Sequence, residues 1–221
     1  MTTTMFIALL VGSYLLGAVP VGYLIGKARG LDVREHGSGN IGATNVGRVI
    51  GRKWGYVCLV LDILKGFGPT FVASVILSEG EPTAAGLWQW MLIGLAAVAG
   101  HVWPIYLRLR GGKGVATTVG VALGIFPHCT IPMLAAVGVY ALIRLTTGLV
   151  SLGSLAIAVV FPLSFFVYVW KSERSMSVFW PLQVATIVLG LLIIVRHRGN
   201  IAKLFRGEER KISDPANETP A

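Results

Sequence analysis

Seven apolar runs follow one another along this 221-residue chain. Most of them approach the roughly 20 residues that a helix needs to cross a lipid bilayer. Only 13% of the residues are charged, against about 25% in an ordinary soluble domain. We therefore predict an all-α integral membrane protein with seven transmembrane helices. The expected spans cover residues 5–26, 54–78, 87–107, 115–129, 130–147, 151–170 and 178–196.

The lysines and arginines predict how these spans are oriented. If all seven runs cross, 16 of the 19 basic residues lie on one side of the membrane, and Lys171 and Arg174 lie on the other. Cytoplasmic loops carry the excess of basic residues in membrane proteins, so the N-terminus is expected outside and the C-terminus in the cytoplasm. The run at 115–129 is short enough to be re-entrant, but this alternation holds only if it crosses.

The rest of the composition limits what the protein can be. We predict one domain over residues 1–212 and a disordered cytoplasmic tail over 213–221, which is polar and contains two prolines. The net charge of +9 follows the membrane topology, so no nucleic-acid partner is expected. Cys58 and Cys129 lack the spacing of a disulfide framework or a zinc site. We predict no metal and no cofactor.

The segment from Gly37 to Arg48 is typical of a phosphate-binding loop. It combines four glycines with hydroxyls, asparagines and an arginine. Glycine permits positive φ and lets the backbone approach a ligand closely. Successive N–H groups can form an anion-binding nest, and a guanidinium can hold phosphate with two parallel hydrogen bonds. A flexible solvated loop is the alternative interpretation.

A second candidate anion site is the glycine-rich segment from Arg108 to Thr117. Lys113 lies between glycines directly before an apolar run. A helix N-terminus with free N–H groups and a neighbouring lysine suits a phosphate. The segment is not a Walker A loop, because Gly114 rather than Ser or Thr follows the lysine. The alternative is a basic loop that only sets the membrane topology.

Two further polar groups lie at the predicted cytoplasmic ends of the last two spans. Ser151 and Ser154 are three residues apart and so share a helix face, and Ser151 is expected to cap the helix. His197 and Asn200 follow the seventh span and lie on one face if the helix continues. The sequence leaves open which of the two serines contacts a ligand.

Asp62 and Lys65 lie inside the second span, three residues apart. Ionisable groups at membrane depth are costly, and they usually pair or face a polar cavity. We predict that the two form an intramembrane pair that supports the site. His101, near the end of the third span, is expected to hydrogen-bond between helices.

Five motifs occur in an order that resembles one bacterial enzyme family. They are Ser38–Asn45 (SGNIGATN), Leu61–Gly66 (LDILKG), Gly100–Pro104 (GHVWP), Gly111–Thr117 (GGKGVAT) and His197–Asn200 (HRGN). Together they resemble the acyl-phosphate:glycerol-3-phosphate acyltransferases, the PlsY family, over nearly the whole chain. The resemblance implies a seven-helix enzyme of the bacterial inner membrane with an active site that faces the cytoplasm.

The resemblance also implies a reaction. Members transfer a fatty acyl group from acyl phosphate to the 1-position of glycerol 3-phosphate, which gives lysophosphatidic acid and phosphate for phospholipid biosynthesis. The expected partners are glycerol 3-phosphate, long-chain acyl phosphate, membrane lipid and an enzyme that makes acyl phosphate from acyl carrier protein. With no metal expected, activity should survive EDTA.

The motifs and the resemblance together give a set of expected site residues. The expected catalytic residues are His197, Asn200, Lys113 and Ser38. The residues expected to bind substrate or phosphate are Ser38, Gly39, Asn40, Gly42, Thr44, Asn45, Arg48, Gly112, Lys113, Gly114, Thr117, Ser151, Ser154, His197, Asn200 and Glu209.

Acyl phosphate is already activated, so the protein needs mainly to position a hydroxyl and to stabilise charge. His197 is the candidate general base. Our hypothesis is instead that the phosphate of the acyl donor takes the proton, because the sequence supplies more phosphate binders than bases. In that case His197, Asn200, Lys113 and Arg48 hold the substrates.

Two other classes of protein compete with this interpretation. A transporter for a phosphorylated solute would suit the glycine-interrupted helices and the intramembrane Asp62 and Lys65. A phosphatidyl-alcohol phosphotransferase needs clustered aspartates for its metals, whereas Asp32, Asp62 and Asp214 are widely spaced.

Overall fold

The computed structural model describes residues 1–77, 81–172, 175–212 and 214. All regular secondary structure in these residues is helical, as predicted. The elements are α1 (Thr3–Ala18), α2 (Val21–Ala28), α3 (Ala43–Val49), α4 (Arg52–Leu77), α5 (Ala84–Val102), the 3-10 helix η1 (Ile105–Leu107), α6 (Val115–Gly124), α7 (Thr130–Thr147), α8 (Val150–Lys171), α9 (Met176–Arg196) and α10 (Arg198–Phe205). The predicted tail at 213–221 lies outside the described residues except for Asp214.

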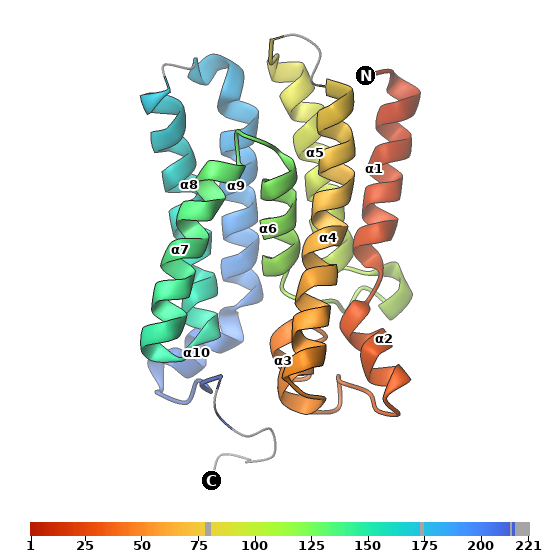
Figure 1. Ribbon diagram of the computed structural model, residues 1–221, viewed down its shortest axis with the longest axis vertical. Coiled ribbons are helices and arrows are strands. Elements are labelled where there is room, and N and C mark those ends of the chain that lie inside the picture. Colours follow the sequence, from red (N-terminus) through yellow and green to blue (C-terminus); the bar gives the residue numbers. More distant parts are fainter. Residues whose placement is uncertain (78–80, 173–174, 213, 215–221) are drawn as a thin grey trace.

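The long helices stand side by side in one bundle (Figure 1). One group contains α1, α4 and α5, the other contains α7, α8 and α9, and α6 lies between them. Six segments of the described chain are long and apolar enough to cross a membrane. They are Thr3–Ala28, Arg52–Leu77, Ala84–Leu107, Thr130–Thr147, Val150–Lys171 and Met176–Arg196.

The fourth predicted span is a much shorter helix than the others. α6 has 10 residues, or about 15 Å of helix, and the hydrocarbon core of a bilayer is about 30 Å thick. The chain nevertheless reverses direction at α6. The helices before and after it, α5 and α7, run toward the end of the bundle that carries α10, and α6 runs in the opposite direction (Figure 1). That residues 115–129 cross the membrane, and that the N-terminus lies outside, stay predictions.

Small residues let α6 pack directly on α4. A Cβ atom on Gly66 of α4 would lie 2.3 Å from the carbonyl oxygen of Thr117, and one on Gly120 of α6 would lie 1.9 Å from that of Ile63. Close backbone approach at small residues is typical of helices packed in membranes. The start of α6, which carries the second glycine-rich segment, is therefore fixed against α4.

The first predicted span, residues 5–26, is not one continuous helix. α1 ends at Ala18 and α2 begins at Val21, because Pro20 has no N–H to donate and its ring disfavours a continuous helix. Lys65 crosses to this break and donates to the carbonyl oxygen of Val19 at 3.1 Å. The predicted span over 87–107 is also interrupted, since α5 ends before Pro104 and only η1 follows.

Candidate functional site

A cavity of about 280 Å³ lies where α3, α4, α6, α8 and the C-terminal segment meet. These parts of the chain lie toward the end of the bundle that carries α10 (Figure 1). All four glycine-rich or polar segments of the sequence contribute polar residues to its wall. Those that were predicted to bind a ligand are Ser38, Asn40, Thr44, Asn45, Arg48, Lys113, Ser151, Ser154, His197, Asn200 and Glu209. The cavity therefore joins segments that are far apart in the sequence.

Apolar side chains also line the cavity. They come from four helices and are Leu59, Ile63, Val115, Val119, Val137, Tyr140, Val150 and Ile157. Sequence reasoning missed these residues, since an apolar side chain in an apolar helix carries no signal that it faces a ligand rather than lipid. The lining thus combines groups that can bind an anion with an apolar surface that suits a hydrocarbon chain.

Most of the predicted binding residues line this cavity, including Gly42 and Gly114, but Gly39, Gly112 and Thr117 do not. Gly39 lies in a turn with φ of 67°, and its N–H donates to His36. Gly112 packs against the ring of His101. Thr117 is fully buried against α4. These three residues therefore pack beside the cavity rather than line it, and that they contact a ligand stays a prediction.

Asn45, a buried residue of α3, holds the loop that precedes this helix. Its Oδ1 accepts from the N–H of Ser38 at 2.8 Å, and its Nδ2 donates to the carbonyls of Val33 and His36 at 2.9 and 3.1 Å. The buried amide thereby ties the loop before α3 to the helix. We predicted Asn45 as a substrate contact, but its hydrogen-bonding groups are engaged by the loop.

Arg48 is half-buried on the last turn of α3. Its Nη2 donates to the carbonyl oxygens of Arg210 and Lys211 at 3.1 and 3.2 Å, and burial lowers the pKa of the guanidinium. The same segment is bonded to the α7–α8 turn, since the N–H of Ile212 donates to Gly148 at 2.9 Å. Arg48 therefore lies beside the cavity with carbonyl partners that an incoming anion could replace.

Lys113 begins a chain of three polar side chains. Its Nζ donates to Oδ1 of Asn200 at 2.6 Å, and Nδ2 of Asn200 donates to Oε1 of Glu209 at 2.7 Å. Burial lowers the pKa of Lys113 to about 8, the Glu209 carboxylate opposes this shift, and Arg48 adds to it. The lysine is charged at neutral pH and is oriented by its amide partner.

His197 is buried at the junction of α9 and α10. Its Nδ1 lies 2.8 Å from the carbonyl oxygen of Ile193. A carbonyl only accepts, so Nδ1 carries the proton, and Nε2 of the neutral ring is left as an acceptor. Burial, followed by the charge of Lys113, lowers the pKa of His197 to about 4. The ring is thus neutral near pH 7.

The two serines of α8 differ in their partners. Ser154 donates to the carbonyl oxygen of Val150 at 2.9 Å within the helix. Ser151 Oγ is buried in the cavity wall and has no hydrogen-bond partner among the described residues. Nor does Ser151 cap α8 as predicted, because Leu149 occupies the N-cap position. The geometry therefore favours Ser151 as the serine that meets a ligand.

Asp62 and Lys65 form an ion pair of 2.9 Å inside α4, and both are buried. Asp62 Oδ1 also lies 3.7 Å from Nδ1 of His101 on α5. Asp62 and His101 line the cavity, whereas Lys65 points to the α1–α2 break. The pair thus reaches from the cavity to the α1–α2 break, and it links α4 to α5 and to that break.

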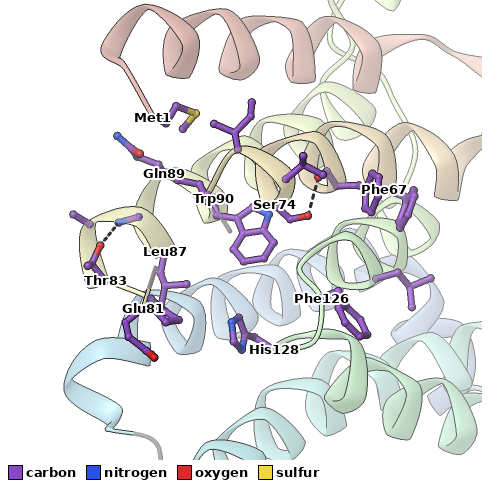
Figure 2. A pocket seen from close by; sticks show the side chains of 18 residues that line it. Met1, Phe67, Ser74, Glu81, Thr83, Leu87, Gln89, Trp90, Phe126 and His128 are labelled. Atoms are coloured by element: carbon purple, nitrogen blue, oxygen red, sulfur yellow. Dashed lines mark hydrogen bonds between the residues drawn. The ribbon is translucent and has the colours of Figure 1, made fainter. Parts of the chain in front are cut away.

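A second and larger cavity, of about 880 Å³, lies between α4, α5 and the turn after α6 (Figure 2). Figure 2 shows Trp90, Phe67 and Phe126 around it, with Glu81 and His128 at its edge. Its described lining contains no lysine and no arginine. It therefore lacks the basic side chains that would hold a phosphate, and the smaller cavity is the candidate functional site.

The fold is thus a helical bundle with the apolar spans of a membrane protein, and one cavity in it is lined by a half-buried lysine and arginine, a buried histidine and apolar side chains. The family model described as glycerol-3-phosphate acyltransferase matches residues 7–207. The chain is 42% identical over 200 residues to the glycerol-3-phosphate acyltransferase of Trichlorobacter lovleyi, covering 90% of this chain and 94% of that protein. It is 40% identical over 217 residues to that of Thermosynechococcus vestitus, covering 96% and 98%.

Solved structures of the same kind of enzyme are also similar to this chain. The crystal structure of PlsY (YgiH), an integral membrane glycerol 3-phosphate acyltransferase, is similar in its glycerol 3-phosphate form with a TM-score of 0.78 and 36% identity, covering 94% of this chain and 95% of that one. Its lysophosphatidic acid form gives a TM-score of 0.76 and 35% identity over the same shares. The chain belongs to the glycerol-3-phosphate acyltransferase family, PlsY, as its five motifs indicate.

Proposed function

We propose that this protein transfers a fatty acyl group from acyl phosphate to the 1-position of glycerol 3-phosphate, giving lysophosphatidic acid and phosphate. The observation that carries the proposal is that Arg48, Lys113 and His197 line one cavity together with apolar side chains from four helices. Both substrates carry phosphate and one carries a long hydrocarbon chain. With the basic residues predicted on the cytoplasmic side, the site faces the cytoplasm of a bacterial inner membrane.

In the proposed reaction the 1-hydroxyl of glycerol 3-phosphate attacks the acyl carbon, and the bond from that carbon to the phosphate oxygen breaks. The hydroxyl proton goes to the departing phosphate. A histidine whose pKa is about 4 is a weak base at neutral pH, so His197 acts through Nε2 as an acceptor that orients the hydroxyl. Arg48 and Lys113 hold phosphate, and Ser151 supplies a further donor.

The test of this proposal is phosphate release in detergent from palmitoyl phosphate and glycerol 3-phosphate together. Acyl-CoA and acyl carrier protein replace the donor in parallel reactions, and only acyl phosphate should support turnover. EDTA should leave the rate unchanged. A transporter of a phosphorylated solute would release no phosphate, and that result would end the proposal.

Replacing His197 with alanine should raise the KM for glycerol 3-phosphate about 10-fold or more and lower kcat less, because a hydrogen bond that orients the acceptor is lost. Steady-state kinetics with each substrate varied in turn measure this. His36→Ala is the control, since His36 is exposed and is not among the residues that line the cavity. A large fall in kcat with an unchanged KM would instead make His197 the base.

The rate should fall above about pH 8, because Lys113, whose pKa is about 8, then loses the charge that holds phosphate. The pH profile of kcat/KM reports groups of the free enzyme. In Lys113→Arg the charge persists to a pH above about 12, so the alkaline limb should move upward by at least one pH unit. An alkaline limb at the same pH in both proteins would assign it to another group.

A further inference from the structure

Arg196 is the last residue of α9 and directly precedes His197, but the mechanism above gives it no part. Its Nη2 donates to the carbonyl oxygens of Gly111 and Gly112, at 3.2 and 3.1 Å. These two glycines lead directly into Lys113. One side chain thus connects the segment that delivers the lysine to the helix end that delivers the histidine.

The same two glycines are held from the opposite side by the end of α5. The N–H of Gly111 donates to Val102 and that of Gly112 donates to His101, both at 3.1 Å. The N–H groups therefore bond to α5 while the C=O groups bond to α9 through Arg196. All four backbone polar groups of this dipeptide have partners, so Arg196 completes the set.

The close approach of the dipeptide to α5 leaves it little freedom on that side. A Cβ atom on Gly111 would lie 2.1 Å from the carbonyl oxygen of His101, and one on Gly112 would lie 2.1 Å from Nε2 of the same residue. His101 is itself buried beside Asp62. The contact with α5 is thus rigid, and Arg196 alone bonds the carbonyl side to α9 among the hydrogen bonds of the described residues.

We infer that Arg196 is a positioning residue, which holds the Lys113 segment at the correct distance from His197 and Asn200. The 2.6 Å bond between Lys113 and Asn200 depends on that distance, because the two side chains come from segments that share no helix. Without the guanidinium, two carbonyl oxygens lose their donors and the segment is tethered only to α5. The inference rests on the proposed function, since it assigns Arg196 a part in that reaction.

The experiment compares Arg196→Ala with wild type and with Arg206→Ala in the phosphate-release assay. Arg206 is a matched control, as an exposed arginine whose ion pair with Glu208 is also exposed. We expect kcat/KM to fall about 100-fold in Arg196→Ala and less than 2-fold in Arg206→Ala, with melting temperatures close to wild type. Millimolar methylguanidinium should restore activity to Arg196→Ala several-fold, and methylammonium should not, because only the guanidinium has the planar shape and the weak hydration of the missing group.

Two results would overturn the inference. One is an Arg196→Ala protein with the kcat/KM of wild type. The other is a loss of activity that follows a lowered melting temperature and that methylguanidinium does not restore, which would make the residue structural only. An inactive wild-type protein in the same assay would instead remove the proposed function, so the two failures are distinguishable.

Discussion

Replacing Lys113 with methionine should lower kcat/KM about 1,000-fold. The change removes a buried positive charge that is oriented by Asn200 at 2.6 Å. Losing one preorganised charged donor in a site of this kind costs about 100- to 1,000-fold in rate. It also removes the positive charge from the hydrogen-bonded series Lys113–Asn200–Glu209, so the Glu209 carboxylate loses a compensating charge. The loss should therefore exceed that of any neutral side chain in the wall.

The measurement is the phosphate-release rate over a range of both substrates. Lys53→Met is the matched control, because Lys53 is exposed and lies outside the cavity. It removes the same charge from the protein and should keep at least half of the activity. A Lys113→Met protein within 10-fold of wild type would show that Lys113 holds neither substrate.

The second large effect is expected on stability rather than on chemistry. Gly120→Ala should lower the free energy of unfolding by about 3 kcal/mol, which is the upper part of the range for overpacking. The new Cβ atom would lie 1.9 Å from the carbonyl oxygen of Ile63, and a backbone atom cannot turn away as a side chain can. The α4–α6 contact would have to open. For a chain of this length the melting temperature should fall by roughly 6–12 °C.

Thermal unfolding can be followed with a thiol-reactive fluorophore, since Cys58 and Cys129 are free and buried in the folded protein. Gly138→Ala is the control. A Cβ atom on Gly138 of α7 would have no heavy atom within 4 Å other than its own helix and chain neighbours, and alanine favours a helix over glycine by about 1 kcal/mol. An unchanged melting temperature in Gly120→Ala would contradict the close packing of α4 on α6.

The two large effects differ in how far the sequence predicts them. Lys113 stands out in the sequence because it lies among glycines before an apolar run, and its motif has a recognisable chemistry. Gly120 does not stand out, since glycine is common in membrane helices. Its importance comes from the position of Ile63, which lies 57 residues earlier in the chain.

The local polar motifs were predicted better as groups than as individual contacts. The sequence brought the Gly37–Arg48 loop, Lys113 and His197 under one hypothesis, and the cavity contains residues from each. Asn45, which was expected to meet a ligand, lines the cavity and also bonds to three backbone groups of its own loop, a structural role that the sequence did not indicate. Ser151 was expected to cap a helix and instead presents an unpartnered, buried hydroxyl to the cavity, within the described part of the chain.

The sequence by itself determined that this is a helical membrane protein of the PlsY family. The length of an apolar run, the bias of its flanking charges and an ordered set of motifs are properties of the chain, and folding does not alter them. Only the tertiary structure decided which apolar residues line the cavity, the packing of Gly120 against Ile63 and the bonds of Arg196 to the Lys113 segment. Each of these depends on contacts between distant residues, such as Lys113 and Asn200, which are 87 positions apart. Such contacts form only when the helices have packed.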